Sequence, residues 1–176
     1  MIKNSIANIT PRQEQTAREI ITQLQKENAQ NIQQGSGPFL AAIYDGKGIL
    51  VAKEPNTVAK DKSCLCHAEI NAIKAACKKF NAYDLAPFNL SIYITAEPCI
   101  MCMGAIMWSG IKKIFYGVNS ADVQKITGFD EGFKPAWLEE FAKRGIEVVG
   151  EIEPEQGRKV LKQYISSGKE IYKPQR

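Results

Sequence analysis

The sequence has a single histidine, so only one position can supply an imidazole as a metal ligand or a base. It also lacks a strong charge of either sign, with 23 lysines and arginines against 19 aspartates and glutamates and a net charge of +4. The basic residues are scattered, and nothing resembles the basic stripe of a dedicated nucleic-acid-binding protein. Nucleic acid is therefore not expected as a partner.

Long hydrophobic runs are missing as well. The longest apolar stretch, from Cys99 to Trp108, is far too short to span a bilayer. The first eight residues contain no apolar core of the length that a signal peptide needs. The number of cysteines, five, is odd, which is more typical of a protein in a reducing compartment than of a secreted protein held by disulfides. We expect a soluble, cytoplasmic protein that does not bind membranes.

The order of periodic segments predicts one domain over residues 1–176, an α/β sandwich built on a mixed sheet. A connection that contains a helix joins the last two strands, and its length favours a parallel crossover. Residues 167–176 form a tail. The expected elements are a helix from Thr10-Pro11, a hairpin of strands 39–44 and 49–52, helix 67–80, strand 90–95, helix 99–108, strand 112–116, an irregular segment 118–134, helix 135–144, strand 146–149 and helix 154–166.

Two short stretches carry the chemistry. The only histidine, His67, is followed two positions later by Glu69, and a Pro-Cys-x-x-Cys sequence with Cys99 and Cys102 opens the helix expected about thirty residues on. One imidazole and two thiolates are three ligands for a tetrahedral zinc ion, which leaves a fourth place for water. The sequence therefore predicts one catalytic zinc ion per chain.

The spacing of His67 and Glu69 adds a geometric prediction. If both residues lay within a helix, their side chains would point about 200° apart, because they are two positions apart. Both can therefore serve one site only if the zinc lies off the helix's N-terminal end. We therefore expect the metal between the N-termini of two helices, with Glu69 as the general acid/base. A Cys-x-x-Cys pair alone is also found in redox and structural zinc sites, but the combination of motifs is that of zinc deaminases.

The chain resembles the cytidine-deaminase-like superfamily and, within it, the bacterial guanine deaminases. The resemblance implies a three-layer α/β/α sandwich with a five-stranded mixed sheet. The stretches that carry it are Gly37-Pro38-Phe39, Asn56, His67-Ala68-Glu69-Ile70, the run from Thr95 to Ile106, Trp108 and Gly128-Phe129-Asp130-Glu131.

The resemblance also implies a purine pocket. Asn56 and the backbone N–H of Ala68 would bind the purine edge, and Glu131 would accept hydrogen bonds from N1–H and the 2-amino group and assist proton transfer. Asp130 is the alternative acid, and Glu131 could instead be an ordinary surface carboxylate. Phe39 and Trp108 would form apolar walls, unless they are ordinary core aromatics.

A homodimer is implied in which the C-terminal tail crosses to the partner and Tyr172 closes the neighbouring site. The alternative is a frayed tail with an incidental tyrosine. The expected reaction is hydrolysis of guanine to xanthine and ammonia, in which zinc-bound hydroxide attacks C2 and Glu69 moves the protons. Other substrates remain open: adenosine in tRNA, guanosine, or the 2-amino-4-oxo ring of a pterin, isocytosine or amino-triazine. A zinc scaffold without activity is the remaining alternative.

Overall fold

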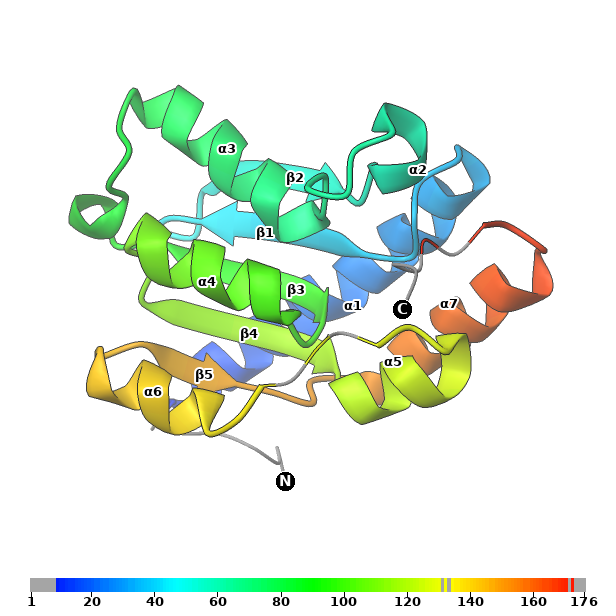
Figure 1. The fold of residues 1–176 in the computed structure, drawn as a ribbon. Helices are drawn as coiled ribbons and strands as arrows, with labels where there is room; N and C mark the ends of the chain where they lie inside the picture. The colour runs from blue at the N-terminus through cyan, green and yellow to red at the C-terminus, as the bar shows by residue number, and fades with distance from the viewer. Residues whose placement is uncertain (1–8, 131, 133, 171, 173–176) are drawn as a thin grey trace.

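A five-stranded sheet with helices on both of its faces forms the body of the molecule in a computed structural model (Figure 1). The structure describes residues 9–130, 132, 134–170 and 172. The strands are β1 Leu40–Tyr44, β2 Leu50–Pro55, β3 Ser91–Ala96, β4 Lys113–Val118 and β5 Glu147–Val149. The helices are α1 Pro11–Gln33, α2 Val58–Asp61, α3 Ala68–Phe80, a 3-10 turn Ala86–Phe88, α4 Ile100–Ser109, α5 Ser120–Thr127, α6 Trp137–Lys143 and α7 Pro154–Ser166.

The sheet is mixed, as expected. Its strand order is β2-β1-β3-β4-β5, with β1 antiparallel to both β2 and β3. Strand β4 runs parallel to β3 and to β5, so the parallel pairing predicted for the last two strands is confirmed. Parallel strands need a crossover, and α4 and α6 lie in the two connections. The carboxyl end of β3 therefore leads straight into the segment that begins α4.

Alternation along the strands creates one core on each face of the sheet. In β3, Ile92 and Ile94 point to the face covered by α3 and α4, and Tyr93 points to the face covered by α1. Small side chains such as Ala72 and Ala76 let α3 approach its sheet face closely, and both are fully buried. This packing holds α3 and α4 side by side, which fixes where their first turns lie.

Helix starts follow local rules that the sequence displays. Thr10 caps α1 with a full capping box, and Pro11 and Pro154 occupy the first turns of α1 and α7. The segment expected to be irregular contains α5, which begins after Asn119, whose side chain accepts from the N–H of Asp122. This eight-residue helix is too short to show clear periodicity, so the prediction of irregular chain there was wrong.

Part of the connection from Lys53 to Cys66, between the hairpin and His67, is regular. Strand β2 continues to Pro55, and the short helix α2 follows it. In the part of the chain that the structure describes, no helix is both long and apolar enough to cross a membrane.

Candidate active site

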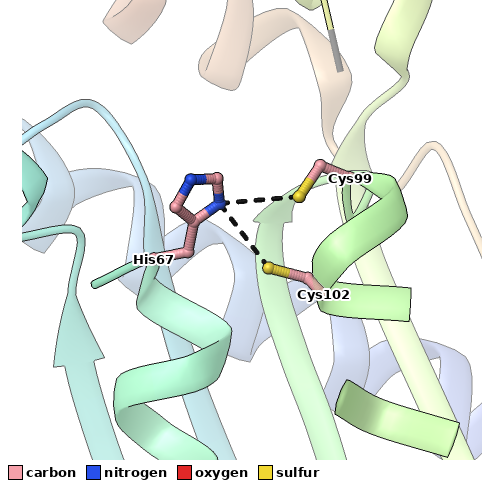
Figure 2. A group of neighbouring side chains, drawn as sticks. All are labelled: His67, Cys99 and Cys102. Atoms are coloured by element: carbon pink, nitrogen blue, oxygen red, sulfur yellow. Dashed lines mark hydrogen bonds between the residues drawn. The ribbon is translucent and has the colours of Figure 1, made fainter. Parts of the chain in front are cut away.

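The starts of α3 and α4 meet beyond the carboxyl end of β3 and bring the two motifs together (Figure 2). His67 is the N-cap residue of α3 and Cys99 is the N-cap residue of α4, both with extended backbone. Cys102 lies in the first turn of α4. The residues thus come from two helix N-termini, the arrangement that the His-x-Glu spacing predicted.

The three ligand atoms are placed as a tetrahedral ion requires. Nδ1 of His67 lies 3.5 Å from Sγ of Cys99 and 3.6 Å from Sγ of Cys102, and all three atoms lie within 4.8 Å of one another. Zinc–sulfur and zinc–nitrogen bonds of about 2.3 and 2.0 Å at a tetrahedral angle would separate sulfur from nitrogen by about 3.5 Å. The donor set and its spacing therefore fit zinc.

The two thiols are electrostatically unequal. A hydrogen bond with Cys102, with a further contribution from His67, lowers the pKa of Cys99 to about 4. The same bond to Cys99, together with burial, raises the pKa of Cys102. The pair thus shares one proton, and a bound divalent cation would displace it because metal ligation takes the thiolate form.

Glu69 lies directly beside these ligands. It is only 6% exposed, and its carboxylate is hydrogen-bonded to the thiol of Cys102. Burial, with the negative charge of Cys99, raises the pKa of Glu69 to about 7. A buried carboxyl group with a pKa near neutrality suits proton transfer in both directions.

A cleft leads from the protein surface to this cluster and has two connected parts. The inner chamber is lined by Phe39, Asn56, His67, Glu69, Ile94, Ala96, Glu97, Cys99 and Phe129. The outer part is lined by Gly37, Pro38, Phe39, Asn56, Val58, Ala59, His67, Thr127, Phe129, Tyr164, Glu170 and Tyr172. Apolar walls with a few polar groups at the base are typical of a site for a small, flat ligand.

Asn56 is common to both parts of the cleft and is buried, with 9% of its surface exposed. Its Oδ1 accepts a hydrogen bond from the N–H of Val58, at 3.3 Å. A β-carbon at Gly37 would lie only 2.6 Å from that oxygen, so glycine is needed there for the amide to occupy its place. Among the described residues Nδ2 has no hydrogen-bond partner, which leaves a donor for a ligand.

Two further expected residues lie at the site. Phe39 lines both parts of the cleft. Ala68 is the first residue of α3 and is fully buried. Its N–H belongs to the first turn, whose donors have no acceptor within the helix.

Trp108 does not join them. It lies near the end of α4, six residues past Cys102 and about 9 Å farther along the axis, and its side chain is 84% exposed. Trp108 therefore lines neither part of its own chain's cleft, and its expected place as a wall of the purine pocket stays a prediction. Helix α4 also leaves Ile100 exposed, so this helix presents apolar side chains to solvent as well as to the core.

The acidic loop is only partly described. Glu131 lies outside the described residues. Asp130, the alternative acid, is exposed and accepts from the N–H of Gly132 at 2.9 Å, and it does not line the cleft. Tyr172 borders the outer part of the cleft in its own chain, whereas the expectation was that it closes the partner's site. Its side chain is 41% exposed.

Several residues that line the cleft were not predicted as site residues, and three of them carry an aromatic ring or a charge beside the site or its mouth. Phe129 lines both parts of the cleft, Glu97 lines the inner chamber, and Glu170 borders the mouth. Phe129 stands in the Gly-Phe-Asp-Glu stretch, and Glu97 directly precedes the Pro-Cys motif. Their positions beside these motifs could have indicated that Phe129 and Glu97 lie at the site. No sequence feature indicated this for Glu170.

Known proteins share this arrangement. Residues 13–118, more than half of the chain, match the family described as the cytidine and deoxycytidylate deaminase zinc-binding region. Guanine deaminase of Bacillus subtilis is 39% identical over 97 residues, which cover 55% of this chain and 60% of that protein. A tRNA-specific adenosine deaminase of Rickettsia typhi is 38% identical over 79 residues, which cover 45% of this chain and 52% of that protein.

Solved structures extend the similarity. Guanine deaminase from Nitrosomonas europaea superposes with a TM-score of 0.81 at 29% identity, covering 93% of this chain and 89% of that one. A structure of the protein NE0047 in complex with 2,6-diaminopurine gives a TM-score of 0.83 at 32% identity, covering 89% of this chain and 85% of that one. With its two helix starts, its His-Cys-Cys cluster and its five-stranded sheet, the chain belongs to the cytidine and deoxycytidylate deaminase zinc-binding family.

Proposed function

We propose that the chain is a zinc-dependent aminohydrolase that converts guanine and water into xanthine and ammonia. The observation that carries this proposal is the buried carboxylate of Glu69 beside His67 and Cys99, at the base of an apolar cleft. Similarity to guanine deaminases and to a protein that binds 2,6-diaminopurine supports a purine base as substrate.

The proposed chemistry divides between the metal and Glu69. A zinc ion held by His67, Cys99 and Cys102 would supply an activated water as the nucleophile. Glu69 would take a proton from that water and deliver it to the departing amino group. The bond from C2 to nitrogen breaks, oxygen takes its place on the ring, and ammonia leaves with the transferred proton.

Ring recognition is assigned to groups around the inner chamber. Nδ2 of Asn56 and the N–H of Ala68 would donate to acceptors on the purine edge, and Phe39 would cover a face of the ring. Glu131 would accept from N1–H and the 2-amino group. Its role rests on its place in the Gly-Phe-Asp-Glu stretch that resembles guanine deaminases.

A panel of amino-heterocycles tests the substrate. Ammonia release is measured with guanine, guanosine, isocytosine, a pterin, an amino-triazine and a tRNA anticodon stem-loop at equal concentrations. Guanine should have the highest kcat/KM. If another compound is turned over and guanine is not, the proposal that guanine is the substrate is contradicted, but the proposed proton transfer by Glu69 is not.

Deamination of tRNA adenosine is the less favoured reaction, although tRNA deaminases are among the relatives. Glu170 and Tyr172 border the mouth of the cleft. A carboxylate at that position would repel a phosphate backbone, and a tyrosine there would narrow the entry for a nucleotide within a folded stem-loop.

The proposal includes a homodimer of single-domain chains. Exposed Ile100 and Trp108 on α4 give it an apolar surface that a second copy would cover. The tail, residues 167–176, would cross to the partner, where Tyr172 would close the site. A cytoplasmic location is proposed because none of the five cysteines is disulfide-bonded and the metal ligands must stay reduced.

A further inference from the structure

The buried face of α1 carries an asparagine among apolar side chains. Asn28 is 1% exposed and lies four residues after Leu24 and four before Ile32, both of which are buried. Asparagine is a weak helix former, and a buried amide loses its hydrogen bonds to water. Stability alone would favour an apolar side chain at this position, so the amide needs a different explanation.

The amide reaches the wall of the cleft. Nδ2 of Asn28 donates to the carbonyl oxygen of Pro38 at 2.8 Å, and Pro38 lines the outer part of the cleft. In the described part of the chain this is the only side-chain hydrogen bond to the segment from Gly37 to Phe39, and Oδ1 of Asn28 has no partner there. The contact thus leads from the helix directly to residues that border the ligand space.

The same segment holds the backbone of Asn56. The N–H of Gly37 donates to the carbonyl oxygen of Asn56 at 3.0 Å, and the N–H of Asn56 donates to the carbonyl oxygen of Phe39 at 2.9 Å. Pro38 lies between these two bonds, and its own carbonyl is the one bonded to α1. A displacement of Pro38 would therefore move both backbone partners of Asn56, whose side chain lines both parts of the cleft.

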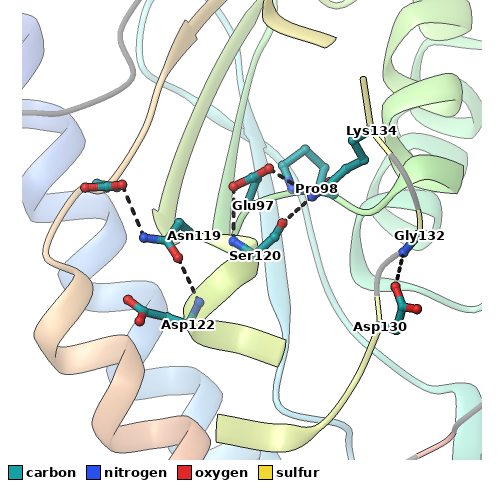
Figure 3. A network of polar contacts seen from close by, with 9 residues as sticks. Glu97, Pro98, Asn119, Ser120, Asp122, Asp130, Gly132 and Lys134 are labelled. Carbon is teal, nitrogen blue, oxygen red and sulfur yellow. Dashed lines mark hydrogen bonds and ion pairs between the residues drawn. The ribbon is translucent and has the colours of Figure 1, made fainter. Parts of the chain in front are cut away.

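Another wall of the cleft has anchors of its own. Oε1 of Glu97 lies 2.9 Å from Nζ of Lys134, and Oε2 of Glu97 accepts from the N–H of Ser120 at 3.1 Å (Figure 3). These contacts secure the segment that leads to Cys99, and none of them involves the wall from Gly37 to Phe39. The two walls are held by separate contacts, so loosening one should leave the metal ligands in place.

We propose that Asn28 is a positioning residue that, through the carbonyl oxygen of Pro38, fixes the wall from Gly37 to Phe39 and thereby the amide of Asn56 that binds the purine edge. The inference rests on the proposed function and adds to it a group outside the cleft that determines how tightly the ring is held. Asn28 lines neither part of the cleft, so it would affect binding only through these contacts.

The experiment compares Asn28→Leu with Ile21→Ala as the matched control. Leucine keeps the branched shape of asparagine but has no donor. Ile21 is fully buried on the same helix and lines neither part of the cleft. For each zinc-loaded protein we would measure kcat and KM for guanine, bound zinc and Tm, and repeat the kinetics in the Asn56→Ala background. Hydrogen exchange at the N–H groups of Gly37 and Asn56 reports on the wall without turnover.

Asn28→Leu should raise KM about fivefold and change kcat less than about twofold, because the amide that orients the ring shifts while the reacting groups stay in place. In the Asn56→Ala background it should change KM by less than about twofold, since the two substitutions affect one contact and are not additive. Ile21→Ala should lower Tm because it leaves a cavity, yet keep KM within about twofold of the parent value.

Two further readouts separate positioning from stability. Zinc content should stay at the parent value in every variant. Exchange at the N–H groups of Gly37 and Asn56 should become about tenfold faster in Asn28→Leu and not in Ile21→Ala, because only the former loosens this wall locally.

An active parent with an unchanged KM for Asn28→Leu contradicts the positioning role. So does an equal rise in KM in both backgrounds, because Asn28 would then act by a route that does not include Asn56. Asn28→Ala repeats the test with a smaller side chain, and failure of both variants to fold would assign the residue to stability alone and overturn the inference. A parent protein that leaves guanine unchanged contradicts the proposed function instead, and the exchange rates at Gly37 and Asn56 then decide whether Asn28 fixes this wall.

Discussion

The inner chamber and the mouth of the cleft differ in what holds their residues in place. In the chamber, Cys99 is 7% exposed and Glu69 is 6% exposed, and both lie at the starts of helices packed on the sheet. At the mouth, Glu170 and Tyr172 follow the end of α7, and Tyr172 is 41% exposed. Helices packed on the sheet therefore position the metal-ligand cluster and Glu69, whereas loops and the tail border the entrance.

This comparison predicts that changes in the chamber affect the reaction itself and that changes farther out affect substrate binding or assembly. The largest effect is expected for Glu69→Gln, which keeps the size of the side chain but cannot transfer the proton. Turnover should fall by about 10²–10⁴-fold with zinc content unchanged. Measured ammonia release close to that of the parent would show that another group moves the proton.

Asn56→Ala should have the next largest effect. It removes a donor from both parts of the cleft without touching a metal ligand. The kcat/KM for guanine should fall about 10- to 100-fold, because the purine would leave a buried acceptor unpaired. Bound zinc, measured by metal analysis, should not change. Loss of zinc in this variant would place Asn56 among the groups that organise the metal site.

Gly37→Ala tests the wall behind Asn56 and should have a smaller effect. The added β-carbon would meet Oδ1 of Asn56 at 2.6 Å, so the amide must shift, and we expect KM for guanine to rise about fivefold. Gly104→Ala is the matched control, because a β-carbon there meets no atom within 4 Å. Equal kinetics for the two variants would mean that the position of Asn56 does not matter.

Trp108→Ser should have the smallest effect on chemistry. The side chain is 84% exposed and lies away from the chamber, so turnover per folded site should stay within about twofold. If α4 is a dimer surface, sedimentation should show a shift from dimer toward monomer. A variant that remains a dimer but loses guanine turnover would return Trp108 to the wall of a pocket, that of the neighbouring subunit.

The metal-ligand cluster and the place of Glu69 beside it could be predicted because their signals are local. His67 and Glu69 lie two residues apart, Cys99 and Cys102 lie within one turn, and both pairs start helices that the apolar pattern reveals. The parallel pairing of the last two strands followed from the length of their connection. In each case the residues that determine the feature lie in one segment of the chain or in the segment next to it.

The rest depends on contacts between distant segments. Lys134 meets Glu97 across 37 residues, and no spacing rule predicts that pairing. Helix α5 was missed because Asn119 caps it but its apolar face is short. Trp108 lies outside its own chain's cleft, and the sequence could not show this because a position next to the metal motif does not reveal which way the far end of α4 points.

The central claim is that one metal ion between two helix starts makes this chain a guanine deaminase. The most direct test measures xanthine formation from guanine before zinc removal by a chelator, after removal, and after zinc is added back. We predict one zinc per chain, turnover that is lost with the metal, and recovery on its return. Turnover that persists without zinc, or a fully loaded protein that leaves guanine intact, would contradict the account.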